Sequence, residues 1–302
     1  MTIGIPRALA YHRYGTLWET FFQELDIPYL VSNETIGSHL TTGRALAVDE
    51  SCLPLKLYMG HAASLRDCCD VLLVPRLERL GKQDEFCVRF WGLPDTVQAT
   101  FGGVELLTYE RKSASHSAEL LAFLQLAKTL GKSPLAAARA YRVAQNRQQE
   151  ADLRRFLQNR VHLRARAPKI LVAAQSYITY DPRLGGAVAD LIRNLGAVPI
   201  FIEAFDRTAC AKAAGQISKD LYWTLNREIL GAIHLAAGKV DGIILLTAFP
   251  CGSDCLANEL VLRRVKTPPI TQILLDEHQS GEGLRTRIES FLDMVERRKE
   301  AI

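Results

Sequence analysis

The sequence predicts an α/β protein with two domains, each built on a parallel sheet, and a helical segment that joins them. Short apolar runs alternate with longer amphipathic stretches in both halves of the chain, as strands and helices do in parallel sheets. This alternation is interrupted between residues 113 and 166. A length of 302 residues is enough for two separate hydrophobic cores.

The first domain is expected to cover residues 1–112. Its apolar runs predict four strands, separated by amphipathic stretches of helical length. The strand-forming runs are residues 2–6, 27–32, 69–77 and 103–110. The stretch 33–42 is rich in Ser and Thr and is interpreted as a turn, and a helix is expected within 43–68.

Residues 113–166 have Leu, Ala and Phe at helical spacing and predict two helices that link or brace the domains. The second helix is rich in arginine, which fits either a solvated helix face or a docking surface for a partner. The strand and helix alternation returns at Lys169, and it defines a second domain over 167–302. Its strand-forming runs are residues 169–174, 197–204, 240–249 and 268–277.

Composition argues against several classes of protein. A net charge of +4 gives no reason to expect nucleic acid or an anionic membrane as a partner. The longest apolar runs are far shorter than the roughly 20 residues of a membrane-spanning helix, and the first residues do not resemble a signal peptide. The P-loop motif for nucleotide hydrolysis does not occur. We therefore expect a cytoplasmic protein whose ATP dependence, if any, belongs to another chain.

The seven cysteines lack the spacing of a disulfide framework, and they include no C-x-x-C pair. Cys251 directly follows the run 240–249 and opens a helix, where the helix dipole favours the thiolate. Ser253 or Asp254 is expected to cap this helix. Cys255 falls one turn further on the same face, so either cysteine is placed to reach a cofactor.

Two more cysteines occupy loop settings. Cys52 precedes a proline at a junction between loop and helix, and Cys87 follows an acidic loop and precedes aromatic residues. Cys68 and Cys69 stand at a helix end before a strand and are expected to be structural. Together with Cys251, Cys52 and Cys87 give three scattered thiolates, which suit an iron–sulfur cluster better than a structural zinc site. Small thiols that only fill space are the alternative.

The last strand is followed by acidic residues around a histidine. His278, Glu277 and Glu282 are candidate catalytic residues, because a histidine flanked by carboxylates is suited to moving a proton. An ordinary capping and hydrogen-bonding cluster is the alternative. Weaker candidates for binding an anionic substrate, all near strand ends, are Arg7, Arg76, Tyr180 and Asp181.

Several motifs occur in an order that is typical of a known family. They are "IGIPRAL", "AVDESCLPLKLYMGH", "DEFCVRFWGLPD", "YITYDP", "LYWTLNREILGA", "VDGIILLTAFPCGSDCLANEL" and "LLDEHQSGEGLRTRIESFLD". In these motifs the chain resembles proteins related to the subunits of 2-hydroxyacyl-CoA dehydratase and benzoyl-CoA reductase. More narrowly, it resembles the acyl-CoA dehydratase activase-related proteins, nearly end to end except across 113–166.

The resemblance implies two flavodoxin-like, Rossmann-type domains with a [4Fe-4S] cluster between them, held by three cysteines. The matching positions are Cys52 in "DESCLPLK", Cys87 before "GLPD" and Cys251 in "CGSD". Val88 stands where the family commonly has proline. Cys255 stands where serine is expected, so it is a candidate fourth or alternative cofactor ligand.

The resemblance also implies an activity. Relatives take single low-potential electrons from an ATP-dependent activase, which would be a separate chain here, and they reduce or dehydrate a small molecule or an acyl-CoA. A homologous subunit or a second copy of the chain and oxygen-free conditions are further expectations. A non-catalytic [4Fe-4S] electron-transfer or cluster-carrying module that docks on a partner through the basic helix is the alternative. A third reading is an α/β binding protein whose cysteines are merely packed.

Overall fold

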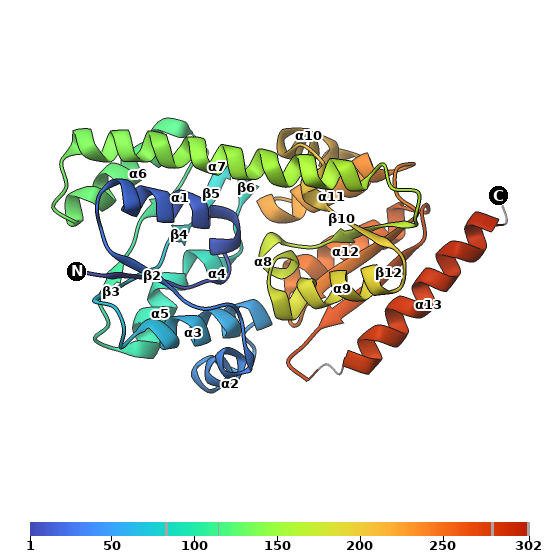
Figure 1. Cartoon of the computed structure of the whole chain (residues 1–302), viewed down its shortest axis with the longest axis horizontal. Coiled ribbons are helices and arrows are strands. Elements are labelled where there is room, and N and C mark those ends of the chain that lie inside the picture. Colours follow the sequence, from blue (N-terminus) through green and yellow to red (C-terminus); the bar gives the residue numbers. More distant parts are fainter. Residues whose placement is uncertain (82–83, 114, 279–280, 301–302) are drawn as a thin grey trace. The chain divides into compact units, whose positions relative to one another are not determined.

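The computed structural model has mixed α/β architecture, with two parallel four-stranded sheets (Figure 1). It describes residues 1–81, 84–113, 115–278 and 281–300. The chain divides into two compact units. The N-terminal unit comprises Met1–Ala151 with Tyr222–Thr224, and the C-terminal unit comprises Asp152–Leu221 with Leu225–Ile302.

The sheet of the N-terminal unit has the strand order β2-β1-β3-β7, and all neighbouring strands are parallel. The strands are β1 (Ile3–Ile5), β2 (Tyr29–Val31), β3 (Val71–Leu73) and β7 (Leu106–Leu107). All four lie in the runs that predict strands, so this part of the prediction is confirmed. The inner strands β1 and β3 are completely buried, because helices cover both faces of the sheet.

Helix α1 (Tyr11–Glu24) covers one face of this sheet, and α3 (Leu53–Leu65) and α5 (Leu93–Phe101) cover the other (Figure 1). This arrangement follows from right-handed crossovers, because the chain moves in opposite directions along the sheet after β1 and after β2. The remaining elements are short, namely α4 (Val88–Trp91), β4 (Arg76–Leu77), β5 (Arg79–Gly81), β6 (Asp84–Glu85) and β8 (Glu110–Arg111).

The turn predicted at 33–42 is wrong in its second half, because helix α2 begins there and spans Gly37–Leu46. The helix packs tightly on α3 at two glycines. A Cβ atom on Gly60 would overlap the carbonyl oxygen of His39, and one on Gly43 would overlap that of Lys56. The Gly, Ser and Thr residues of α2 favour helix weakly, so this close packing on α3 stabilises the helix.

The two helices predicted between 113 and 166 are present as α6 (His116–Thr129) and α7 (Pro134–His162). Helix α7 contributes residues to both units. In the N-terminal unit the Leu17 N–H donates to Oε1 of Gln148 at 3.1 Å. In the C-terminal unit the Phe201 N–H donates to Oδ1 of Asn159 at 3.1 Å.

The sheet of the C-terminal unit has the order β10-β9-β11-β12, again entirely parallel. The strands are β9 (Lys169–Ala173), β10 (Val198–Phe201), β11 (Gly242–Ala248) and β12 (Ile270–Leu275). These are the four strands that the sequence predicts. The order is the same as in the N-terminal sheet, since in both units the first strand lies between the second and the third.

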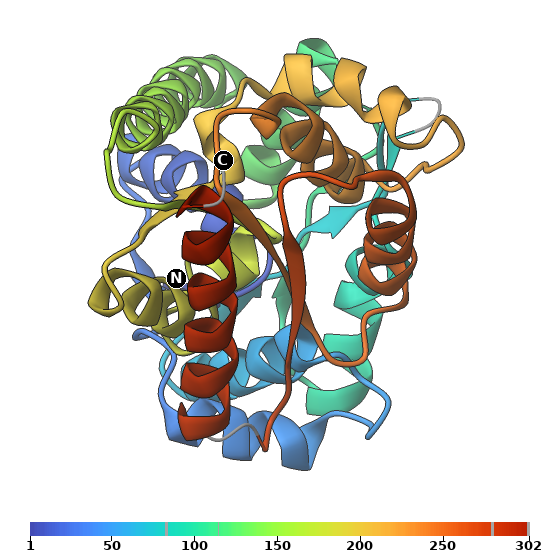
Figure 2. The same ribbon diagram turned by 90° about the vertical axis from the view of Figure 1, so that its right-hand side faces the viewer.

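Helices α9 (Ala187–Asn194) and α13 (Gly281–Glu300) pack together on one face of this sheet, and α11 (Thr224–Ala236) and α12 (Gly252–Arg264) cover the other (Figure 2). The shorter helices and turns are α8 (Ser176–Thr179), α10 (Arg207–Ala213), η1 (Pro182–Gly186), η2 (Ile202–Ala204) and η3 (Ala214–Gln216). Across the described residues, every helix is too short or too polar to cross a membrane.

Candidate functional site

Three of the seven cysteines stand at the start of a helix, and they are the three predicted to bind metal. Cys52 is the N-cap of α3, Cys87 is the N-cap of α4 and Cys251 is the N-cap of α12. Each has extended backbone torsion angles, and none uses its sulfur to cap the first turn. All three side chains are half-buried. The fold therefore gives them one common local setting.

Local sequence explains where these helices begin. Pro54 lies in the first turn of α3, where the fixed φ of proline suits a helix and its missing N–H is not needed. Helix α12 begins right after β11, and its N-cap is Cys251. The prediction that Ser253 or Asp254 caps α12 is therefore wrong. Asp254 is inside the first turn, where its carboxylate accepts hydrogen bonds from other segments.

A buried polar network supports the first turn of α12. Asp254 is only 4% exposed, and its Oδ1 accepts hydrogen bonds from Nε2 of Gln175 at 2.9 Å and from Nδ2 of Asn226 at 2.6 Å. Burial raises the pKa of Asp254, although hydrogen bonds from both amides and from Cys251 oppose the rise. The Cys251 Sγ also lies 3.5 Å from Oγ of Ser253. This network holds the turn that presents Cys251.

Sequence reasoning considered Asp254 only as a helix cap and missed the network. Gln175 follows β9 and Asn226 lies in α11, so both partners are distant from Asp254 in the sequence. No local pattern joins them. An aspartate three residues after a candidate ligand was the only signal in the sequence.

Cys255 lies one turn along α12 from Cys251, as predicted. Its N–H donates to the Cys251 carbonyl at 3.0 Å. The Cys255 side chain is exposed, whereas that of Cys251 is half-buried. Both thiols therefore belong to the first part of the same helix, and Cys255 is the more accessible one.

The other cysteines are not at helix starts. Cys210 is buried in α10, and Cys69 is half-buried with its sulfur against Gly4. These settings agree with packing. Cys68 is exposed in the turn after α3, so it lacks the packed setting expected of a structural cysteine.

The candidate ligands are divided between the two units. Cys52 and Cys87 belong to the N-terminal unit, and Cys251 and Cys255 belong to the C-terminal unit. Within the parts of the chain that the structure describes, no three His, Cys, Asp or Glu side chains are arranged to hold a metal ion. The ligand set therefore stays a prediction that rests on each cysteine's local setting.

The candidate catalytic residues lie in and after a turn that follows β12. The His278 N–H donates to Oδ1 of Asp276 at 2.8 Å, and its Nε2 is 3.6 Å from Oε1 of Glu277. The His278 side chain is 70% exposed, and Glu282 is exposed in the first turn of α13. Because β11 and β12 are parallel neighbours, this turn and Cys251 lie at the same edge of the sheet.

Two of the weaker anion-binding candidates make interactions in the N-terminal unit. The Arg76 guanidinium donates to both carboxylate oxygens of Asp95 at 2.7 and 2.9 Å and to the Trp91 carbonyl at 2.6 Å. The Nε of Arg7 donates to the Ser32 carbonyl at 3.1 Å. These contacts give both arginines a structural role.

The other two candidates are in the C-terminal unit. The Asp181 Oδ1 accepts hydrogen bonds from the N–H groups of Arg183 and Leu184 at 2.9 and 3.2 Å, so Asp181 caps η1. The guanidinium carbon of Arg155 lies 4.9 Å from the ring centroid of Tyr180. Asp181 thus has a structural role, whereas Tyr180 lies close to a cationic group.

A buried histidine cluster in the N-terminal unit gave no signal in the sequence. His61 is fully buried, with Nδ1 2.9 Å from Oγ of Ser32 and Nε2 2.9 Å from Oγ1 of Thr35. The ring of His39 stacks on it, with centroids 4.0 Å apart. Burial, reinforced by neighbouring basic groups, lowers the pKa of His61 to about 3. His61 is therefore neutral near pH 7 and serves as a hydrogen-bonding part of the core.

Comparison with models of protein families gave a match to the CoA enzyme activase uncharacterised domain over residues 2–205. The matched region contains Cys52 and Cys87, and it ends within the C-terminal unit before Cys251. A comparison with curated proteins gave no match.

Proposed function

Because the chain belongs to the family of the CoA enzyme activase uncharacterised domain, we propose that it is an iron–sulfur protein that works with a CoA-enzyme activase. In this proposal the activase is a separate, ATP-dependent chain that delivers low-potential electrons. The protein then reduces or dehydrates a small substrate, for which an acyl-CoA is the leading class. Cys52, Cys87 and Cys251 are the proposed ligands of a [4Fe-4S] cluster.

One observation supports the proposal: the three cysteines to which the sequence resemblance assigns the cluster are also the three that stand at the N-caps of helices. Iron is ligated by the thiolate. The first N–H groups of a helix have no partner within the helix, and the helix dipole adds positive potential, so both favour an anionic sulfur. Helices α3 and α12 supply both effects over 13 residues each, while α4 is a single turn that supplies N–H groups.

Neighbouring side chains have supporting roles in this proposal. A bound [4Fe-4S] cluster supplies one-electron transfer at low potential. Asp254 holds the first turn of α12 through Gln175 and Asn226, and it thereby keeps Cys251 in one orientation. His278, with Glu277 and Glu282, is proposed to move protons at the same sheet edge, and its exposure lets it exchange them with solvent.

A second candidate function is supported by the position of Cys255. Its exposed thiol is one helical turn from Cys251, which makes it a candidate fourth sulfur ligand. A cluster with four thiolate ligands offers no exchangeable position to a substrate, so the chain would then be an electron carrier. Cyanide would perturb the visible spectrum of a cluster with an exchangeable position and leave that of the carrier unchanged. If Cys255 is the fourth ligand, the Cys255→Ser variant gains the cyanide response.

The ligand assignment is tested by measuring iron and acid-labile sulfide in five variants purified without oxygen. Cys52→Ser, Cys87→Ser and Cys251→Ser are each expected to lose the cluster. Cys68→Ser and Cys69→Ser are matched controls in the N-terminal unit, one exposed and one half-buried, and both are expected to retain it. Circular dichroism checks that every variant is folded. Equal iron in all five variants would refute the assignment.

A further inference from the structure

An exposed apolar stripe follows the C-terminal part of α7. It consists of Leu153, Leu157 and Val161, which are 55%, 53% and 65% exposed. The three positions are four residues apart, so they form one ridge about 12 Å long on the surface of the helix. All three belong to the C-terminal unit. Single exposed aliphatic residues are common on protein surfaces, whereas a continuous ridge of them is typical of an interaction surface.

The opposite face of this part of α7 is used within the C-terminal unit. Asn159 is buried, and its Oδ1 accepts the hydrogen bond from the Phe201 N–H at 3.1 Å. The guanidinium carbon of Arg155 lies 4.9 Å from the ring centroid of Tyr180. These contacts fix which face of the helix is turned outward. The stripe is therefore a surface held in place by the fold.

The stripe is flanked by positive charge. Between residues 153 and 168 the chain has five arginines and no Asp or Glu. Arg154 and Arg160 are exposed and fall on opposite sides of the stripe. The guanidinium carbon of Arg160 lies 5.8 Å from the ring centroid of Phe156, which keeps its charge beside the helix. Among the described residues, no carboxylate forms an ion pair with Arg154 or Arg160.

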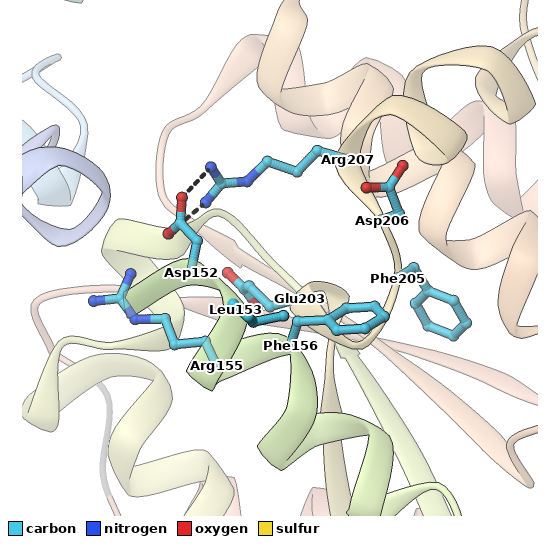
Figure 3. A pocket seen from close by; sticks show the side chains of 8 residues that line it. All are labelled: Asp152, Leu153, Arg155, Phe156, Glu203, Phe205, Asp206 and Arg207. Atoms are coloured by element: carbon cyan, nitrogen blue, oxygen red, sulfur yellow. Dashed lines mark hydrogen bonds and ion pairs between the residues drawn. The ribbon is translucent and has the colours of Figure 1, made fainter. Parts of the chain in front are cut away.

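The carboxylates nearest the stripe already have partners. A pocket of about 290 Å³ at the first residue of the stripe is lined by three acidic side chains (Figure 3). Asp152 accepts hydrogen bonds from the guanidinium of Arg207 at 2.9 and 3.4 Å. Asp206 caps α10, and Glu203 is hydrogen-bonded to Tyr180. These groups therefore leave the arginines beside the stripe available to a partner.

Shape and charge together select one kind of partner. A ridge of residues four apart fits the groove between the ridges of another helix, which must place apolar side chains opposite it. Arginines on both sides favour Asp and Glu along the flanks of that helix, as in the charged positions beside a coiled-coil seam. A second copy of the chain would bring the same arginines, so like charges would meet. The stripe also lacks the Trp and Tyr side chains that concentrate at membrane interfaces.

We propose that the stripe and its flanking arginines form a docking surface for an acidic amphipathic helix of a partner protein. Leu153, Leu157 and Val161 contact the apolar face of that helix, and Arg154 and Arg160 pair with its carboxylates. The surface is small, so the contact is transient rather than part of a permanent assembly. The proposal holds with or without a bound cluster. Only the identification of this partner with the activase would rest on the proposed function.

The test measures the binding of two synthetic helical peptides to the full chain by fluorescence anisotropy. Both peptides have about three heptads with Leu at the first and fourth positions, and they differ only in carrying Glu or Lys beside the Leu seam. The wild type is expected to bind the Glu peptide at least about tenfold more tightly than the Lys peptide. Binding of the Glu peptide should weaken as the salt concentration rises, because exposed charges are screened.

Two variants test the two kinds of contact. Leu157→Ser should weaken binding of the Glu peptide about tenfold, because it removes an apolar contact. Arg160→Glu should weaken the Glu peptide and strengthen the Lys peptide. The matched controls are Leu121→Ser on α6 and Arg287→Glu on α13, which change exposed residues outside the stripe and should bind both peptides like the wild type. Circular dichroism checks that every variant is folded.

The proposal is overturned if the Glu peptide does not bind at millimolar concentration, or if Leu157→Ser binds it as the wild type does. Sedimentation of the chain, alone and with phosphatidylglycerol vesicles, tests the other occupants. A dimer that Leu157→Ser dissociates would identify a second copy as the occupant, and vesicle binding that it abolishes would identify a membrane; either result overturns the proposal. All measurements are made without reconstituted iron, so these failures leave the cluster proposal standing.

Discussion

The N-terminal sheet, β2-β1-β3-β7, and the C-terminal sheet, β10-β9-β11-β12, connect their strands in the same order, yet different side chains follow the strands. In the N-terminal unit His61 makes hydrogen bonds with Ser32 and Thr35, and both of its ring nitrogens are used. In the C-terminal unit Asp254 holds the turn of Cys251 by accepting hydrogen bonds from Gln175 and Asn226.

This difference shows what strand order can and cannot predict. The order places the carboxyl ends of parallel strands at one edge, where α/β proteins bind ligands. Whether such an edge forms a closed hydrogen-bonding network or keeps groups for a ligand depends on individual side chains. The N-terminal unit uses its buried imidazole for stability, and the C-terminal unit uses the buried carboxyl group of Asp254 to hold the turn that presents Cys251.

The largest expected effect comes from filling the space at a helix crossing in each unit. A Cβ atom on Gly60 would overlap the His39 carbonyl, and one on Gly231 would overlap the Cys210 carbonyl. Backbone atoms cannot move away easily, so we expect Gly60→Ala and Gly231→Ala each to lower the free energy of unfolding by roughly 3 kcal/mol. The measurement is urea unfolding of the full chain.

Two optical signals show which unit a substitution destabilises. The three tryptophans, Trp18, Trp91 and Trp223, all belong to the N-terminal unit, so their fluorescence follows that unit, while circular dichroism follows both. Gly60→Ala should move the urea unfolding transition seen by fluorescence to lower urea concentration. Gly231→Ala should do so mainly for the transition seen by circular dichroism. Gly215→Ala, where a Cβ atom meets open space, is the control. Identical effects of Gly215→Ala and Gly60→Ala would contradict the packing argument.

Removing the carboxylate of Asp254 is expected to have the next largest effect. Asp254→Ala leaves the buried amide groups of Gln175 and Asn226 without their acceptor, and we expect a loss of about 2 kcal/mol. The dichroism transition in urea measures it. Asp190→Ala, an exposed carboxylate on α9 of the same unit, is the control. A loss no larger than that of Asp190→Ala would show that the network adds no stability.

The two networks should respond to pH in opposite directions. The pKa of His61 is lowered by folding, so its contribution is present above about pH 6.5 and is lost as the pH falls toward about 3. Its slope is at most about 1.4 kcal/mol per pH unit. The pKa of Asp254 is raised by folding, so its contribution is present at low pH and is lost as the pH rises through that pKa.

Unfolding in urea at several pH values, followed by fluorescence and by dichroism, checks these slopes. His61→Asn should flatten the pH slope detected by fluorescence, which follows the N-terminal unit. Asp254→Asn should flatten the slope detected by dichroism, which also follows the C-terminal unit. Wild-type slopes that both variants leave unchanged would mean that other groups control the pH dependence.

The smallest effect is expected at His278, whose side chain is 70% exposed. His278→Ala should change the free energy of unfolding by less than about 0.5 kcal/mol, as surface substitutions usually do. It should also leave the iron content unchanged, since a proton-moving role does not require His278 to hold the cluster. A clear loss of stability or of iron would assign His278 a structural role instead. Thermal unfolding and iron analysis measure both quantities.

Strands were the part of the fold that the sequence predicted best. All eight strands of the two sheets lie in apolar runs, because a parallel sheet with helices on both faces needs apolar residues without interruption. Helix α2 was missed because its stability comes from the contacts of Gly43 and Gly60 with α3, which no local pattern shows. The helix-start setting of Cys52 and Cys251 was predicted, since a strand or a proline marks those junctions.

Long-range partners could not be predicted. The donors to Asp254 are 79 and 28 residues away from it, and the partners of His61 are 29 and 26 residues away. The pocket around Glu203 likewise joins α7 to the end of β10. Such sites depend on tertiary packing, which hydrophobic periodicity does not describe.

The central claim, a [4Fe-4S] cluster held by Cys52, Cys87 and Cys251, is tested most directly by iron and acid-labile sulfide per chain. The protein is purified without oxygen, reconstituted with iron and sulfide, and desalted, with zinc measured as a control. The account predicts about four of each per chain, as one cubane requires. Negligible iron and sulfide after anaerobic reconstitution would contradict it.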